Sequence, residues 1–92
     1  MTLQQLKYVI EIAERGSITE AAKSLFIAQP SLSAAIRELE EETSTNIFVR
    51  KSRGVLLTPE GAEFLGYARQ VVQQAALFRF HAALLVHLQR IY

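Results

Sequence analysis

The last third of the sequence predicts one long helix. From Pro59 to about Gln89 no further proline interrupts the chain, and Gly61 and Gly66 are the only weak helix formers. About thirty helical residues would span ~45 Å, far more than the body of a 92-residue protein needs. We therefore expect two units: a small body over residues 1–58 and a protruding linker helix over residues 59–92.

Apolar residues recur along this helix at steps of four and three, the spacing of a heptad seam. Large and small residues alternate in it, which favours close packing against a second helix. The seam could also fold back over the body, but Leu32, Ile36 and Leu39 already supply partners for a small core. We therefore predict that it is a dimer interface, formed by Phe64, Ala68, Val71, Ala75, Phe78, Ala82 and Leu85.

The composition excludes several classes of function. The chain has no cysteine and no aspartate, and His81 and His87 point about 240° apart on a helix. We therefore expect no catalytic site, no metal site, no cofactor and no enzyme activity. The first residues do not form an export signal, and every unbroken apolar run is far shorter than the ~18 residues that span a bilayer. We expect a cytoplasmic protein without membrane contact.

Charge is distributed unevenly along the chain. The net charge is +1, but residues 1–42 carry four basic and seven acidic side chains, and residues 43–92 carry six basic and two acidic ones. Any contact with a polyanion must therefore be local and depend on a few placed groups.

The first 58 residues predict three short helices and a hairpin. Apolar spacing from Leu3 to Ala13 indicates the first helix, which Gly16 ends. Ser17 and Glu20 form a capping-box pattern before the second helix, which runs to Leu25. A third helix occupies about residues 30–42, and strands at 47–50 and 55–57 flank a loop over residues 51–54. The predicted fold class is mostly α: a winged helix-turn-helix followed by a long dimerisation helix.

In such a fold the third helix reads DNA. Gln29 can make two hydrogen bonds to an adenine edge, Ser31 and Ser33 can reach a base or a phosphate, and Arg37 suits guanine or phosphate. The acidic run 40–42 lies at the far end, so the helix should enter the major groove amino end first. Residues 50–54 carry clustered cations that would contact phosphate or the minor groove: Arg50, Lys51 and Arg53.

These residues also carry a family resemblance. The runs Gly16-Ser17-Ile18-Thr19-Glu20-Ala21-Ala22-Lys23-Ser24-Leu25 and Ala28-Gln29-Pro30-Ser31-Leu32-Ser33, with Ile36 and Leu39-Glu40, resemble the DNA-binding domain of LysR-type transcriptional regulators. Ile47-Phe48-Val49-Arg50, Arg53-Gly54 and Leu57-Thr58-Pro59-Glu60-Gly61 extend the similarity to about residue 75. Two positions depart from the family pattern: Ala34 stands where arginine is frequent, and Thr43-Ser44 stands where Leu-Gly is usual.

The resemblance implies a bacterial regulator, located on the nucleoid, that binds an interrupted palindrome in double-stranded DNA as a homodimer. Such dimers commonly pair into tetramers. An effector domain normally follows the linker, so we expect no small-molecule effector site in residues 1–92. By position, the DNA-binding residues would be Ser17, Thr19, Gln29, Pro30, Ser31, Ser33, Arg37, Arg50 and Arg53.

Several alternatives remain open at this point. Arg37 could pair with Glu40 or Glu41 at the surface, and Arg50 could pair with the glutamates of the third helix. The chain could also be a winged-helix module for protein–protein interaction or dimerisation that does not bind DNA. In a third interpretation, residues 75–92 lie on a membrane surface, although Arg79 and Arg90 supply little attraction to anionic lipid.

Overall fold

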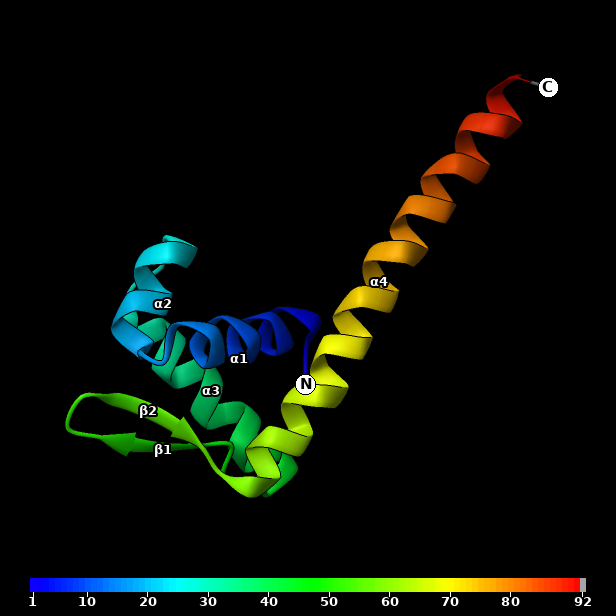
Figure 1. Cartoon of the computed structure of the whole chain (residues 1–92). Helices are drawn as coiled ribbons and strands as arrows, with labels where there is room; N and C mark the ends of the chain where they lie inside the picture. Colours follow the sequence, from blue (N-terminus) through cyan, green and yellow to red (C-terminus); the bar gives the residue numbers. More distant parts are fainter. Residues whose placement is uncertain (92) are drawn as a thin grey trace.

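The computed structural model describes residues 1–91, apart from the side chain of Ile91. The elements follow in the order α1 (Leu3–Arg15), α2 (Ile18–Leu25), α3 (Gln29–Thr43), β1 (Phe48–Lys51), β2 (Gly54–Leu57) and α4 (Pro59–Ile91). Figure 1 shows α1, α2, α3 and the hairpin on one side of the first half of α4, where α1 and β2 contact it, and the second half of α4 projects away from them. The predicted winged helix-turn-helix with a long final helix is confirmed. The predicted end of the linker helix at residue 92 lies outside the described residues.

A compact core lies between α1, α2 and α3. Each helix contributes apolar side chains at steps of three and four, so that one face of each is covered by the other two. Ile47, which directly precedes β1, is fully buried and joins the hairpin to this core. The buried members of the cluster are Val9, Ile12, Ile18, Ala21, Ala22, Leu32, Ile36, Leu39 and Ile47.

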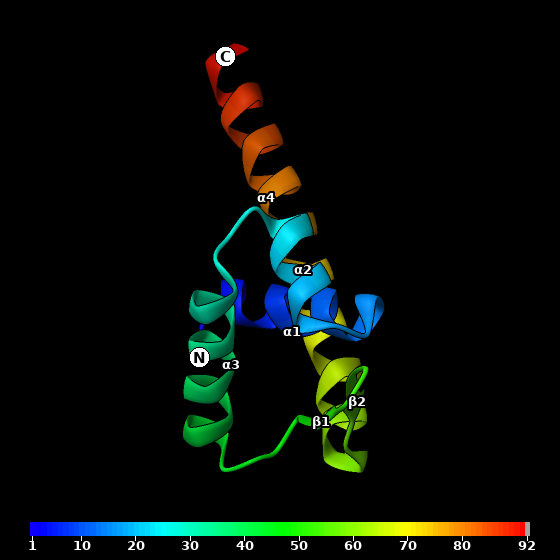
Figure 2. The ribbon, with the colours of Figure 1, turned by 90° about the vertical axis from the view of Figure 1, so that its left-hand side faces the viewer.

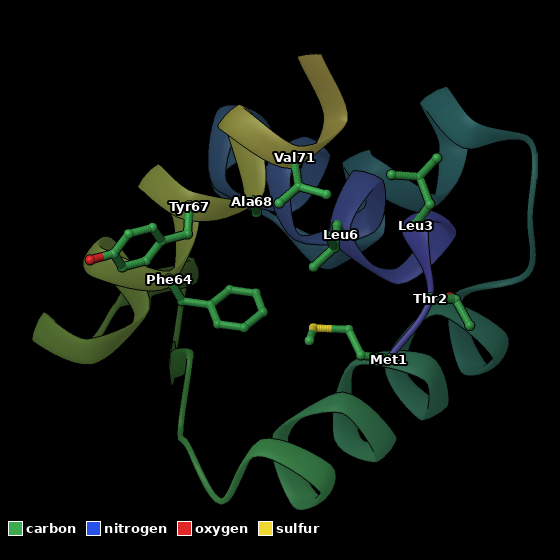
Figure 3. Close-up of a pocket in the computed structure, with 8 residues that line it drawn as sticks. All are labelled: Met1, Thr2, Leu3, Leu6, Phe64, Tyr67, Ala68 and Val71. Carbon is green, nitrogen blue, oxygen red and sulfur yellow. The ribbon is translucent and has the colours of Figure 1, made fainter. Parts of the chain in front are cut away.

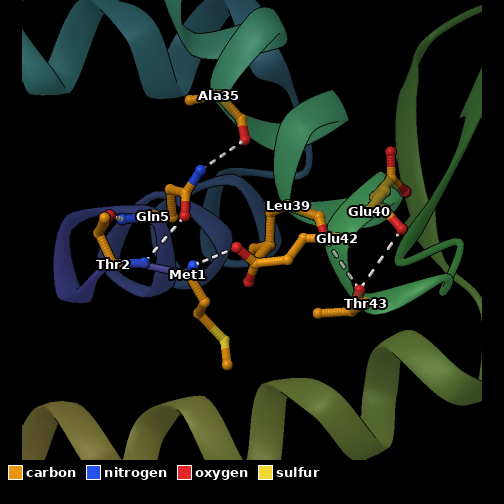
Figure 4. Close-up of polar contacts among 8 residues, drawn as sticks. All are labelled: Met1, Thr2, Gln5, Ala35, Leu39, Glu40, Glu42 and Thr43. Carbon is orange, nitrogen blue, oxygen red and sulfur yellow. Dashed lines mark hydrogen bonds and ion pairs between the residues drawn. The ribbon is translucent and has the colours of Figure 1, made fainter.

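The first residues of the chain connect α1 to α3 (Figure 4). The amide of Thr2 donates to the side-chain oxygen of Gln5 at 2.9 Å, and the amide of Gln5 donates to the Thr2 hydroxyl at 3.1 Å. This reciprocal cap fixes the start of α1. The Gln5 amide nitrogen also donates to the carbonyl of Ala35 at 3.3 Å, and the terminal amino group pairs with Glu42.

The turn between α1 and α2 supports the hairpin. Gly16 ends α1 with φ of 67°, as predicted, and its carbonyl accepts a hydrogen bond from the amide of Val55 at 3.0 Å. The Ser17 hydroxyl accepts from the amide of Glu20 at 3.2 Å and so caps α2. The predicted return bond from the Glu20 side chain is not formed, because that carboxylate pairs with Lys23 at 3.4 Å.

The hairpin is tighter than the sequence predicted. Its strands pair with Lys51 opposite Gly54, so the loop consists of two residues, Ser52 and Arg53, in place of the predicted four. Gly54 has φ of 110°, and a Cβ there would lie 2.3 Å from the carbonyl oxygen of Gly16. Glycine therefore allows the loop to close while the hairpin lies against the α1–α2 turn.

The start of α4 is fixed to the end of α3 and the hairpin. Thr58 caps α4, since its hydroxyl accepts from the amide of Gly61 at 2.8 Å and contacts the carbonyls of Asn46 and Ile47. A Cβ at Gly61 would lie 2.0 Å from the carbonyl oxygen of Ile47. Backbone therefore packs on backbone at this joint.

Two residues of the predicted dimer seam pack inside the chain. Ala68 is only 2% exposed, and Phe64 is half-buried against the core. Ala68 packs against α1 in the single chain and lines the groove between α1 and α4, and its role in a dimer interface stays a prediction. The first turns of α4 therefore belong to the body, although the predicted boundary at residues 58 and 59 matches the start of the helix. The remaining seam, which we call the exposed seam, consists of Val71, Phe78 and Leu85, which are exposed, and Ala75 and Ala82 between them, which are half-buried.

The projecting part of α4 is unusually apolar. By length and composition alone, Pro59–Arg90 could cross a membrane: an 18-residue window has a mean hydropathy of 1.3, and none of it is buried. The exposed part nevertheless carries Arg79, His81 and His87. Its apolar side chains are therefore open to a partner, with polar groups set among them.

Candidate nucleic-acid interface

The amino end of α3 is exposed and has no side-chain cap. Its N-cap residue, Ala28, has no side chain that could accept a hydrogen bond from the first turn. Gln29 and Pro30 begin the helix and are both exposed. This end of α3 therefore presents its positive dipole end to solvent, where an anion is favoured.

One side chain of α2 orients the first residue of α3. The hydroxyl of Thr19 donates to the side-chain oxygen of Gln29 at 3.1 Å. Both side chains are exposed, so the amide nitrogen of Gln29 is left to contact a ligand. This hydrogen bond connects the first turn of α2 to the first turn of α3 at the protein surface.

The hairpin reaches α3 through Arg50. Its guanidinium Nη2 donates to the hydroxyl of Ser33 at 3.5 Å, a long hydrogen bond. Among the residues described, no carboxylate lies within 4.0 Å of the charged groups of Arg37, Arg50, Lys51 or Arg53. The alternative pairings of Arg37 and Arg50 with glutamates of α3 are therefore not formed, and these cations are available to an anionic partner.

Glu40 has a structural role that sequence analysis missed. Its Oε2 accepts hydrogen bonds from the amide of Ile47 at 2.7 Å and from the amide of Phe48 at 3.3 Å. The carboxylate thus fixes the start of the hairpin against α3. The sequence shows only an acidic run, because the turn that brings residue 47 back to residue 40 is not encoded in local spacing.

Two adjacent hollows lie between α3, the start of α2 and the hairpin. The backbones of these three elements can be followed in Figure 2. The larger, of about 380 Å³, is lined by Ser33, Arg37 and Arg50 among others, and the smaller, of about 180 Å³, by Ser17, Thr19 and Gln29. Arg50 and Ile18 line both. Six of the nine predicted DNA-binding residues therefore lie together: Ser17, Thr19, Gln29, Ser33, Arg37 and Arg50.

The other three predicted residues lie around this surface. Pro30 and Ser31 are exposed in the first turn of α3, and Ser31 lies about 200° around the helix from Gln29. Arg53 is at the exposed tip of the hairpin. Lys51, predicted only as a cation of the wing, lines the smaller hollow.

A second surface is apolar. A groove of about 450 Å³ lies between the start of α1 and α4 (Figure 3). In Figure 3, Met1 and Leu6 face Phe64 and Val71 across it. The groove opens on the side of α4 that carries Val71, the first residue of the exposed seam. Its lining residues are Met1, Thr2, Leu3, Leu6, Phe64, Tyr67, Ala68 and Val71.

Comparison with known proteins assigns the chain to a family. The sequence model described as "Bacterial regulatory helix-turn-helix protein, lysR family" matches residues 3–62. The HTH-type transcriptional regulator TfdS of Cupriavidus pinatubonensis is 41% identical over 73 residues, which cover 79% of this chain and 25% of TfdS. The chain thus spans about a quarter of the length of the curated relatives it matches.

Solved structures agree in fold over nearly the whole chain. The DNA-binding domain of BenM, in a crystal structure with the catB site 1 DNA, superposes with a TM-score of 0.90 at 37% identity, over 94% of this chain and 97% of that one. The CbnR DNA-binding domain in its DNA complex also gives 0.90, at 32% identity, over 94% and 99% of the two chains. Both similar structures were solved bound to DNA.

Proposed function

The chain belongs to the LysR family of bacterial helix-turn-helix regulators, and from this we propose that it binds double-stranded DNA sequence-specifically, as a dimer, to control transcription. The observation that carries the proposal is the joint surface of α3 and the hairpin. There an uncapped helix start lies beside cations that no carboxylate neutralises. The similarity to two DNA-bound domains supports the same assignment. As a regulator of this family it acts inside the cell, and we place it on the nucleoid in the cytoplasm.

We assign the DNA contacts to α3 and the hairpin. The helix enters the major groove amino end first, with Gln29 and Ser33 at base edges and Arg37 at a guanine or a phosphate. Its other end carries Glu41 and Glu42, which phosphate would repel. Ser17 and Thr19 approach the backbone from α2. Arg50 and Arg53 of the hairpin contact phosphate groups or the minor groove.

We assign the dimer to α4. Val71, Phe78 and Leu85 are 49%, 74% and 61% exposed along the seam, and the apolar groove at the α1–α4 junction lies beside them. A twofold pair would place the projecting seam of each copy in the groove of the other. Such a pair presents two α3 helices, and an interrupted palindrome is the DNA site that matches this symmetry.

The test is fluorescence anisotropy of labelled duplexes over a salt series, with random DNA beside a pool selected from interrupted palindromes. Arg53→Ala should weaken binding to all sequences alike and reduce the salt slope by about 0.9 for each phosphate contact that is lost, which is about 1.8 for the two copies in a dimer. Gln29→Ala should instead relax discrimination at one base pair by about 1–3 kcal/mol. Arg90→Ala, which removes a cation in the last turn of α4, at the projecting end away from α3, is the matched control and should change neither property.

The outcome also distinguishes DNA binding from the alternative function, a winged-helix module for protein–protein interaction. Tight, salt-dependent binding that prefers the selected pool supports the proposal. If neither pool binds at low salt, the DNA assignment is wrong and the chain is better described as a protein-interaction module.

A further inference from the structure

The hydrogen bond between Thr19 and Gln29 limits what each side chain can do at a DNA surface. The Thr19 hydroxyl donates to Oε1 of Gln29 at 3.1 Å, and both side chains are exposed. A hydroxyl carries one hydrogen, and phosphate oxygens only accept. While this bond is made, Thr19 has no proton left for a phosphate. Its effect on DNA binding therefore passes through Gln29.

The same bond fixes which group of Gln29 faces a ligand. Oε1 is turned toward Thr19, and within the described part of the chain Nε2 makes no hydrogen bond and keeps two hydrogens to donate. A bidentate contact with adenine needs Oε1 to accept from the N6 amino group while Nε2 donates to N7. Thr19 competes for that carbonyl oxygen. A contact made by Nε2 alone keeps the bond to Thr19 and requires acceptors on the base.

Two further donors lie on the same side of α3. Gln29, Ser33 and Arg37 recur at steps of four, which places them within about 80° around the helix, and we call them the donor row. The Ser33 hydroxyl accepts from Nη2 of Arg50 at 3.5 Å, a long bond that leaves its own proton to donate. The guanidinium of Arg37 has donors only. The donor row therefore offers hydrogens along its whole length.

Guanine is the base whose major-groove edge offers acceptors and no donor. It presents N7 and O6, whereas adenine presents N7 beside an amino group, cytosine presents an amino group, and thymine presents O4 beside its methyl group. We propose that Thr19 is a positioning residue for Gln29, and that it makes Gln29 select guanine in place of adenine. This inference rests on the DNA-binding function proposed above, and it names the base that one residue of that surface selects.

The first measurement tests the bond in the free protein. The order parameter of the Gln29 side-chain amide, from ¹⁵N relaxation, should exceed that of Gln70, which is exposed on α4. Thr19→Val keeps the shape of the side chain without its hydroxyl and should lower the Gln29 value to that of Gln70. Thr19→Ser keeps the hydroxyl and is the matched control. Circular dichroism checks that both variants keep the fold, and an equal Gln29 order parameter in wild type and Thr19→Val overturns the positioning role.

The second measurement is the base preference. Gln29→Ala identifies the base pair that Gln29 contacts, and duplexes with each of the four base pairs at that place are compared by fluorescence anisotropy at one salt concentration. The wild type should prefer guanine over adenine about five- to tenfold, the value of one hydrogen bond. Thr19→Val should lose this preference, because the carbonyl is free to accept from adenine, and Thr19→Ser should retain it. In the Gln29→Ala background, Thr19→Val should leave the relative affinities unchanged.

The possible results separate this proposal from the proposed function. If Thr19→Val weakens binding to all four duplexes by the same factor and keeps the guanine preference, Thr19 contacts phosphate, and the positioning role is wrong while DNA binding stands. A wild type that prefers adenine at this base pair also overturns the positioning role and leaves DNA binding standing. A wild type that binds no duplex at low salt overturns the DNA-binding function and the base preference together.

Discussion

At the scale of single residues, two helices end in a left-handed conformation without the glycine that favours it. Phe26 closes α2 with φ of 57°, and Ser44 closes α3 with φ of 51°. Both residues are exposed, so neither gains packing in return. A Cβ in this region costs roughly 1–2 kcal/mol. The family usually has Leu-Gly where this chain has Thr43-Ser44. This chain therefore places a Cβ at the left-handed position where glycine is usual, and the difference should cost stability.

Ser44→Gly should therefore stabilise the protein. The gain expected is about 0.5–1 kcal/mol, after subtraction of the extra freedom that glycine has in the unfolded chain. Thermal and urea unfolding would measure it. Gly16→Ser is the reciprocal control, because Gly16 has φ of 67° and a Cβ added there would meet nothing within 4 Å, and it should lose a similar amount. Equal stability of Ser44→Gly and wild type would show that the turn is not strained.

Glu11 makes stability depend on pH. The Ser24 hydroxyl donates to its Oε1 at 2.6 Å and the Arg15 guanidinium donates at 2.8 Å, and these bonds hold the pKa of the Glu11 carboxyl below its ordinary value of 4.5. A lowered pKa in the folded state stabilises the fold above pH 4.5, and the stabilisation is lost as pH falls through the lowered pKa.

Ser24→Ala should lower the free energy of unfolding by about 1 kcal/mol at neutral pH. The difference from wild type should shrink in acid, once Glu11 is protonated. Urea unfolding from pH 7 to pH 3 measures both effects, and Ser52→Ala in the exposed hairpin loop is the control. A difference that stays constant over this pH range would assign the loss to packing instead of the carboxylate bond.

At the scale of elements, the joint between the hairpin and α4 depends on one glycine. Gly61→Ala would place a Cβ 2.0 Å from the Ile47 carbonyl oxygen, which already accepts the Thr58 amide at 3.0 Å. The backbone must shift to relieve this contact, and we expect a loss of about 1–3 kcal/mol. Gly66→Ala lies five residues along the same helix with no atom within 4 Å, and it should gain up to about 1 kcal/mol. Chemical denaturation of the two variants tests the contrast, and similar effects would refute the close contact.

The elements were predictable from the sequence where local patterns determine them. The periodicity of α1, the cap at Ser17 and the stop at Gly16 all depend on residues within one or two turns, and the structure has each of them. The contacts between elements were not predictable in the same way. Three contacts join residues that only the tertiary fold brings together. The Glu40 carboxylate accepts hydrogen bonds from amides at the start of the hairpin, the Gly16 carbonyl accepts one from Val55, and α1 packs on Ala68. For the same reason the seam was predicted as one surface, although its first part is core.

At the scale of the whole molecule, the proposed dimer should make DNA affinity depend on the spacing of two half-sites. Val71→Glu with Phe78→Glu places like charges in the exposed seam and should give a monomer. Ala76→Glu with Ala83→Glu adds the same charges at the same spacing on an exposed side away from the seam, and this control variant should remain a dimer.

A dimer that binds two linked half-sites has an affinity roughly 10²–10⁴ higher than a protein that binds a single half-site. Wild type and control should therefore lose affinity when half a helical turn is inserted between the half-sites. The monomer should bind both duplexes equally and weakly, and spacing dependence in the seam variant would show that α4 does not set the distance between the two α3 helices.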